Sequence, residues 1–183
     1  MIFDLIDYIL GEFKMLIYKI SYRGKLSYNP YSKFSSGFQL RLFNKSTFKS
    51  GRNVVIRSGV KIRCNNSGQI MIKDDVGFNN NCLINCMESI FIGSHTIIGQ
   101  DVKMYDHDHD YKIEGNRRYT GFKTAPIIIG ENVWIGSGCT ILRGTTIGNN
   151  CVIAAGTVLK GNIPTDMIVY NEKKLNMKPI ITE

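Results

Sequence analysis

A six-residue repeat constrains the fold of this chain more than any other feature of its sequence. In the second half of the chain an aliphatic residue recurs at every sixth position, and another apolar or small residue follows four places after each of them. The aliphatic series runs through Ile129, Ile135, Ile141, Ile147, Ile153 and Leu159. An amphipathic helix would repeat near 3.6 residues and a half-buried strand near 2. A period of six therefore indicates coils with three flat faces, whose aliphatic side chains fill the interior.

The same register extends toward the amino terminus with short interruptions. Further copies of the six-residue unit begin at Ile56, Ile62, Ile72, Phe78, Ile84, Ile92 and Ile98. In such a stack each coil buries its apolar face only against the next one, so neighbouring coils stabilise each other. Gly or Asn is expected to turn the corners, where the backbone needs a positive φ. The repeat therefore predicts a triangular prism over roughly residues 54–164.

These hexads resemble the left-handed β-helix proteins of the hexapeptide-repeat family, and the left-handed sense of the coil is what that resemblance implies. We expect a mainly β fold, a left-handed parallel β-helix, in three parts. A partly helical N-terminal cap region occupies residues 1–53, the β-helix occupies residues 54–170, and a tail occupies residues 171–183. Residues 105–126 interrupt the repeat and are expected to form a protruding active-site loop.

Composition and charge limit the kinds of partner that the chain is expected to bind. Hydrophobic residues make up 43% of its 183 residues, which is enough for one core and rules out a disordered chain. A formal net charge of +8 favours anionic partners: nucleic acid, a phosphate-rich cofactor, an acidic glycan or an anionic membrane surface. No RNA- or DNA-binding motif accompanies this charge, so we expect no nucleic-acid partner. The amino terminus is acidic where a signal peptide needs positive charge, so we expect a cytoplasmic protein.

The cysteines follow the repeat rather than a redox or metal pattern. Five cysteines occur without a CxxC pair, which indicates neither a disulfide framework nor a zinc ribbon. Three of them, Cys82, Cys139 and Cys151, occupy the fifth place of their hexads, a small inward position. Because free cysteine there behaves as a small buried hydrophobe, we interpret these three as core residues.

The interrupting loop carries the residues best suited to chemistry. It contains His107 and His109, two of the three histidines of the chain, among aromatic and basic residues. The run Asp-His-Asp-His at 106–109, followed by Pro126 and by Val-Trp-Ile-Gly at 133–136, resembles the hexapeptide acyltransferases. The resemblance is strongest to the members that O-acetylate sugars and surface polysaccharides.

That resemblance implies a histidine general base. Counted from Val102, the catalytic histidine of the family corresponds to His109, and His107 takes an accessory place. An imidazole with a pKa near 6.5 can accept the proton of a sugar hydroxyl as its oxygen attacks the acetyl thioester. Either Asp106 or Asp108 would orient the ring and stabilise the transient imidazolium.

The same resemblance implies the residues that bind the substrates. It assigns acceptor binding to Asn81, and we expect Trp134 to form a wall against the acceptor or the cofactor. From the composition of the loop, we expect Tyr111 to stack on sugar rings and Arg117 to meet acidic sugars. Coenzyme A is expected to contact Trp134, Ser137 and Ala155, with its phosphates met by the cations Arg143 and Lys160. The backbone amide of Ser137 is also the implied donor to the oxyanion, which adds it to the catalytic residues. Structural alternatives stay open: Asn81 is a residue type that turns corners, Trp134 a packing residue and Lys160 a solvated surface lysine.

The N-terminal segment lies outside the resemblance. Its apolar residues fall on one helical stripe, formed by Ile2, Leu5, Ile6, Ile9, Phe13, Leu16, Ile17 and Ile20. Charged residues within the segment exclude a membrane-spanning interpretation. Two interpretations stay open: a helix that caps the open end of the prism, and a helix that docks peripherally on the inner face of a membrane.

Taken together, these features predict an acetyltransferase that uses acetyl-CoA as acetyl donor, needs no metal, and modifies a hydroxyl of a sugar or surface polysaccharide by direct transfer. The resemblance also implies a homotrimer with each active site between adjacent prisms. Three alternatives stay open. These are an N-acetyltransferase acting on an amino-sugar nucleotide, a γ-carbonic-anhydrase-like metal enzyme that would use His95, His107 and His109, and a non-catalytic scaffold that binds protein or lipid.

Overall fold

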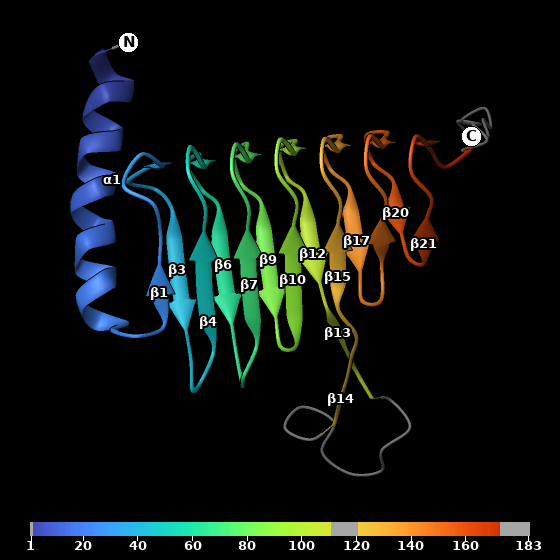
Figure 1. Ribbon diagram of the computed structural model, residues 1–183, viewed down its shortest axis with the longest axis horizontal. Helices are drawn as coiled ribbons and strands as arrows, with labels where there is room; N and C mark the ends of the chain where they lie inside the picture. The colour runs from blue at the N-terminus through green and yellow to red at the C-terminus, as the bar shows by residue number, and fades with distance from the viewer. Residues whose placement is uncertain (1, 111–120, 173–183) are drawn as a thin grey trace, which may run out of the picture.

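The computed structural model describes residues 2–110 and 121–172 as one helix followed by a stack of short parallel strands. Three strands form each coil, and equivalent strands of successive coils pair side by side (Figure 1). Because the chain visits the three resulting sheets in a fixed order, they are called face 1, face 2 and face 3. The result is the predicted triangular parallel β-helix.

Each face contains one strand from each coil it crosses. Face 1 contains β1 (Leu26–Ser27), β4 (Thr47–Ser50), β7 (Gln69–Ile72), β10 (Ser89–Ile92), β15 (Ile127–Ile129), β18 (Thr146–Ile147) and β21 (Asn162–Ile163). Face 2 contains β2 (Lys33–Phe34), β5 (Val55–Ile56), β8 (Gly77–Phe78), β11 (Ile97–Ile98), β16 (Trp134–Ile135), β19 (Val152–Ile153) and β22 (Ile168–Val169). Face 3 contains β3 (Gln39–Leu42), β6 (Lys61–Cys64), β9 (Leu83–Cys86), β12 (Lys103–Tyr105), β17 (Thr140–Leu142) and β20 (Val158–Leu159). Two antiparallel strands, β13 (His107–His109) and β14 (Phe122–Thr124), form a hairpin arm outside these sheets.

The interior is filled by ladders of aliphatic side chains in register. On face 1, Ile70 of β7 aligns with Ile90 of β10, and Ile90 aligns with Ile127 of β15; all three are buried. Side chains alternate between the interior and solvent along each strand. The hexad period therefore arises because each six-residue segment supplies one short strand and one turn, and each strand points the same positions inward.

Asparagine and aspartate turn many of the corners. Asn53, Asn81, Asn132 and Asn150 have φ angles of 55°, 62°, 55° and 56°. These values lie in the left-handed region, which Asn tolerates better than most residues other than glycine. The prediction that Asn turns the corners of the prism is confirmed.

The prism begins earlier than residue 54, the boundary expected from the hexads. Strands β1 to β4, between residues 26 and 50, pair in register with the coils that follow. Their inward places include Phe34, Phe38 and Phe48, all of them buried. The aliphatic period fades in this segment because aromatic side chains fill a core whose coil geometry continues unchanged.

All five cysteines lie in the core. Cys82, Cys139 and Cys151 are at most 1% exposed, which confirms their interpretation as core residues. Burial raises the pKa of the Cys82 thiol to about 11 and also raises the pKa of Cys139. Cys64 and Cys86 align in register on face 3 and point inward as well. Thiols in such apolar surroundings are inert.

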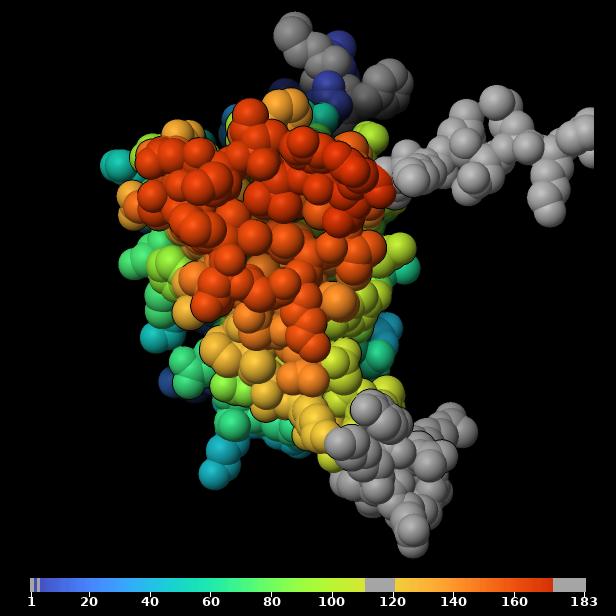
Figure 2. All heavy atoms as spheres, turned by 90° about the vertical axis from the view of Figure 1, so that its right-hand side faces the viewer, coloured from blue at the N-terminus to red at the C-terminus, as the bar shows by residue number. Residues whose placement is uncertain are grey.

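Helix α1 (Ile2–Ser21) lies across the N-terminal end of the prism (Figure 1). Gly11 permits the close approach, since a side chain there would collide with the backbone carbonyl of Phe34. Met15 is buried against the core. At the opposite end, shown in Figure 2, the last coils complete the stack. Across residues 2–110 and 121–172, no helix is both long enough and apolar enough to cross a membrane.

Candidate active site

The hairpin arm leaves the prism at the corner between face 3 and face 1. Strand β12 ends at Tyr105, Asp106 occupies the corner, and the chain returns to face 1 at Ile127. Within the arm, His107 pairs with Thr124 and His109 pairs with Phe122. Because side chains alternate along a strand, His107 and His109 share one side of the arm and Asp108 points to the other. The arm thus presents two imidazoles together.

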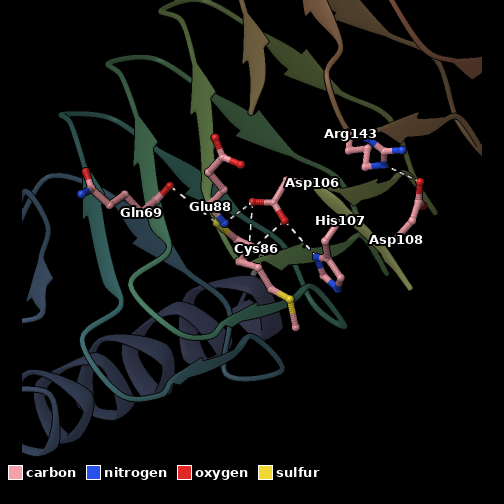
Figure 3. A network of polar contacts seen from close by, with 8 residues as sticks. Gln69, Cys86, Glu88, Asp106, His107, Asp108 and Arg143 are labelled. Carbon is pink, nitrogen blue, oxygen red and sulfur yellow. Dashed lines mark hydrogen bonds and ion pairs between the residues drawn. The ribbon is translucent and has the colours of Figure 1, made fainter. Parts of the chain in front are cut away.

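Asp106 is a completely buried carboxylate at the base of the arm (Figure 3). Its two oxygens accept hydrogen bonds from the backbone amides of Met87 and Glu88, each at 2.8 Å. Its Oδ1 also lies 2.9 Å from Nδ1 of His107. A carboxylate in this place holds the proton on Nδ1 and leaves Nε2 of the neutral ring as the acceptor. Asp106 therefore fixes both the orientation and the tautomer of His107.

The two imidazoles meet at the ring of Phe122. The His109 ring lies 4.7 Å from the Phe122 ring, centroid to centroid, in a tilted arrangement. The His107 ring lies 5.6 Å from it in an edge-to-face arrangement. The side chain of His107 is 14% exposed, while His109 is exposed. Of the two rings, His109 is therefore the more accessible to a substrate.

Asp108 and Arg143 fasten the other side of the arm to the prism. Nε of Arg143, just after β17, lies 2.5 Å from the carboxylate of Asp108. A second ion pair joins Lys123 to Asp110 at 3.2 Å. Of the two carboxylates proposed from the sequence to orient a histidine, Asp106 contacts His107, whereas Asp108 pairs with Arg143. The Arg143 charge, expected to meet coenzyme A, therefore already has an anionic neighbour.

A second group of predicted residues lies at the corner between face 2 and face 3. Ser137 and Ala155 are exposed there in successive coils, and the hydroxyl of Ser137 accepts a hydrogen bond from the amide of Gln100. Gly99 lies close beneath, and a side chain there would approach the Ser137 amide nitrogen within 2.6 Å. Trp134 projects from face 2 and is 57% exposed. Asn81 turns this same corner in an earlier coil.

The two groups are separated by the width of face 3. Ser137 precedes strand β17, and Arg143 follows it. The hairpin arm and Lys160 belong to the corner after face 3, while Trp134, Ser137, Ala155 and Asn81 precede that face. The described residues expected to form one site therefore do not converge within one chain. Tyr111 and Arg117, also assigned to the acceptor site, lie outside the described residues.

Sequence reasoning missed the contacts that hold Asp106. The Met87 and Glu88 amides come from residues 86–91, where the hexad register is interrupted, and that interruption was the available signal. It also missed a groove of about 360 Å³ on face 3, whose lining includes Arg41, Lys61 and Arg63. Outward places of successive hexads line this groove, so stacking the hexads in register would have revealed it.

The histidines of the described residues are divided between two corners. His95 turns the corner between face 1 and face 2 and lies 3.6 Å from the carboxylate of Asp75. His107 and His109 lie on the arm at another corner. Within residues 2–110 and 121–172, no cluster of three or more His, Cys, Asp or Glu side chains is arranged to hold a metal ion.

Comparison with known proteins places this geometry in context. A family model described as "Bacterial transferase hexapeptide (six repeats)" matches residues 126–161. Over 145 residues the chain is 28% identical to "Putative lipopolysaccharide biosynthesis O-acetyl transferase WbbJ" of Escherichia coli K12, covering 72% of this chain and 71% of that protein. Alignments with other curated relatives span about half of those proteins.

Two solved structures share the architecture. AntD, an N-acyltransferase from Bacillus cereus in complex with dTDP and 3-hydroxybutyryl-CoA, superposes with a TM-score of 0.70 and 20% identity, covering 85% of this chain and 81% of that one. A hexapeptide-repeat acetyltransferase from Vibrio cholerae, complexed with acetyl-CoA, superposes with a TM-score of 0.53 and 23% identity, covering 89% of this chain and 74% of that one. The predicted left-handed β-helix fold is thereby confirmed.

Proposed function

We propose that this chain is a hexapeptide-repeat acetyltransferase that transfers the acetyl group of acetyl-CoA to a hydroxyl of a sugar or surface polysaccharide, as its similarity to such proteins suggests. The Escherichia coli relative is named for O-acetyl transfer in lipopolysaccharide biosynthesis, and the Vibrio cholerae structure contains acetyl-CoA. The observation that carries the proposal is the pair of imidazoles on one side of the arm, above the buried Asp106.

The proposed reaction is a direct acyl transfer. The sugar oxygen attacks the thioester carbonyl carbon while an imidazole nitrogen accepts the hydroxyl proton. The tetrahedral oxyanion then collapses, the carbon–sulfur bond breaks, and the coenzyme A thiolate takes the proton from the imidazolium. The backbone amide of Ser137 is the proposed donor to the oxyanion, from an exposed corner position. This sequence uses neither a covalent enzyme intermediate nor a metal.

We assign the base to His109 and a positioning role to His107. His109 is exposed on the arm, so an acceptor hydroxyl can reach its ring. His107 is mostly enclosed, and its Nδ1 is committed to Asp106 at 2.9 Å. Because Asp106 holds the His107 ring in place, we propose that this ring restricts the position of the His109 imidazole. His109 lies two residues further along the same side of the arm. The positively charged groove on face 3 lies one strand away from β12, the strand that leads into the arm. This groove favours an acceptor that carries negative charge.

We further propose a homotrimer in which the arm of one subunit meets the corner between face 2 and face 3 of the next. Such an assembly would unite the two groups of residues that face 3 separates within a single chain. The outer side of face 2 supports this idea, because Ile97 and Trp134 are adjacent in register and 54% and 57% exposed. Apolar surface of this kind is typical of a contact surface.

The assembly can be tested by subunit complementation. Co-expression of His109→Ala and Trp134→Ala chains should give mixed assemblies with some seams that contain both intact residues. Activity above that of either variant alone is the expected result. Activity no higher than the average of the two variants would mean that each site lies within one chain.

The activity itself is tested by acetyl transfer to a panel of acceptors. Purified protein and radiolabelled acetyl-CoA are incubated with neutral sugars, acidic sugars, polysaccharides and amino-sugar nucleotides. We expect alkali-labile acetyl esters on a saccharide hydroxyl, and no label without acceptor. Alkali-stable amides on an amino-sugar nucleotide would instead support the N-acetyltransferase alternative. Absence of acetyl-CoA binding would support the non-catalytic scaffold.

A further inference from the structure

Helix α1 places its polar side chains against the prism. The Asp7 carboxylate accepts hydrogen bonds from the amide and the hydroxyl of Ser36. The Lys14 ammonium donates to the carbonyl oxygens of Ser36 and Phe38, at 2.9 and 2.7 Å. Glu12 lies on the partly buried side as well, and burial raises its pKa. Asp7 and Lys14 therefore attach the helix to the first coil.

The opposite side of α1 is apolar and faces outward. Nine large apolar residues of the helix are each 48–72% exposed: Ile2, Leu5, Ile6, Ile9, Leu10, Phe13, Leu16, Ile17 and Ile20. Terminal caps of repeat proteins normally present a polar outer face to water. This cap has the reverse polarity, and a contiguous apolar patch of this size marks an interaction surface.

The charge of the chain is concentrated at the same end. Residues 1–63 contain twelve Lys and Arg against three Asp and Glu, whereas residues 64–183 contain eleven against twelve. Lys19, Arg23 and Lys33 are exposed on α1 and the segments that follow it. The whole positive excess of the protein therefore accompanies the apolar helix.

A side chain suited to a lipid–water boundary lies beside the helix. Tyr31 is 75% exposed and lines a cleft of about 400 Å³ together with Leu5 and Ile9 of α1. Tyrosine combines an apolar ring with a polar hydroxyl and is enriched at membrane interfaces. An apolar helical face flanked by cations and aromatic residues is typical of helices that lie in the plane of a bilayer surface.

We propose that α1 docks flat on an anionic lipid bilayer, with its outer apolar side in the headgroup region and the exposed cations on acidic lipids. The charge distribution favours this occupant over a second copy of the chain. Two copies joined through α1 would bring two strongly cationic ends together, and like charges repel. An anionic membrane surface instead attracts them.

Vesicle sedimentation tests the proposal with the full chain. The wild type is mixed with phosphatidylcholine vesicles, with or without one-quarter phosphatidylglycerol, and pelleted at low and high salt. The test variant is Ile9→Asp with Phe13→Asp, on the outer side of α1. The matched control is Val158→Asp with Ile168→Asp, two apolar residues of similar exposure on β20 and β22 in the last coils. Circular dichroism checks that each variant is folded, and Ile9→Ser with Phe13→Ser replaces the test variant if it is not.

The wild type is expected to bind vesicles that contain phosphatidylglycerol, and less so at high salt. The test variant should bind at least about 10-fold more weakly, and the control like the wild type. Wild-type protein that stays in the supernatant with anionic vesicles would overturn the proposal, as would an equal loss in the control. Light scattering supplies a further check, because a test variant with half the wild-type mass would show that a second copy covers α1.

Discussion

The inward position at the end of the face 3 strand holds Leu42, Cys64 and Cys86 in three successive coils, and Asp106 in the fourth. All four side chains are at most 5% exposed. In the first three coils the position is filled by an apolar side chain or a thiol. In the fourth coil the same place holds a carboxylate that accepts two backbone amide hydrogen bonds and contacts His107.

The fold and the arm place different requirements on the side chain at this position. The earlier coils demonstrate that an apolar residue suffices for a stable prism at this place. A buried carboxylate is costly unless hydrogen bonds compensate it. Asp106 has such bonds on both oxygens, and one of its partners is a histidine of the arm. We infer that this carboxylate serves the arm rather than the stability of the prism.

The largest loss of stability is expected when a carboxylate is placed in the core without hydrogen-bond donors beside it. Ile141 is fully buried in the core of face 3. Ile141→Asp should cost more than about 4 kcal/mol, because the charge would lack hydrogen-bond donors. Urea denaturation monitored by circular dichroism measures the change. A variant as stable as the wild type would mean that the core tolerates an uncompensated charge. The hydrogen bonds of Asp106 would then not be needed for its burial.

Replacing Asp106 itself should be milder but still substantial. Asp106→Leu restores the apolar residue of the first coil yet leaves the Met87 and Glu88 amides unpaired, at about 1–3 kcal/mol for each. Asp106→Asn keeps an acceptor for the amides and should destabilise less. Both variants should lower kcat, since His107 loses its fixed tautomer. A Leu variant with wild-type stability and kcat would show that the carboxylate serves neither the fold nor the arm.

Ionisation of a buried thiol should cause a smaller loss of stability, which depends on pH. Burial raises the pKa of Cys82 from 9.0 to about 11, so the unfolded chain ionises this thiol first. Its contribution to stability is therefore fully present below pH 9 and is lost as the pH rises to about 11. The loss should amount to about 3 kcal/mol at most. Urea midpoints between pH 8 and 10.5 should fall more steeply for the wild type than for Cys82→Ala, and equal slopes would contradict the assignment.

The smallest change in stability is expected at the ion pair that fastens the arm. Arg143→Ala should alter the free energy of unfolding by less than about 1 kcal/mol, because Asp108 is half exposed. Its effect on acetyl transfer should be larger than that of Lys160→Ala, the matched cation one coil further along the same corner. If Lys160→Ala raises the KM for acetyl-CoA and Arg143→Ala does not, Lys160 is the cofactor ligand and Arg143 only anchors the arm.

The prism was predictable because its information is local and repeated. Each inward residue, such as Ile135 or Ile153, has equivalents six positions away, so a single sequence reveals the core. The first coils were missed because Phe34 and Phe48 interrupt the aliphatic pattern without interrupting the stack. Helix α1 was recognised as an apolar stripe, but the sequence alone left its outward orientation undetermined. The spacing of apolar residues does not reveal which side of the helix faces the prism. Here the hydrogen bonds with Ser36 turn the polar side inward.

The candidate site was less predictable because it depends on contacts between distant segments. The histidines were found from their motif, and Asp106 or Asp108 was expected to orient the catalytic ring. The contact of Asp106 with His107 could be seen only in the folded chain. The amides of Met87 and Glu88 carry no signal in their side chains. The separation of Ser137 from the arm follows from the width of face 3, which resemblance to a motif does not convey.

The most direct test of this account compares kcat/KM for acetyl transfer among the wild type, His109→Ala, His107→Ala and His95→Ala. Removal of the base should reduce kcat/KM by about 100-fold or more for His109→Ala. His107→Ala should lose less, and His95→Ala, at a corner away from the arm, should match the wild type. Wild-type turnover by the His109→Ala enzyme would contradict the assignment of the hairpin arm as the catalytic element.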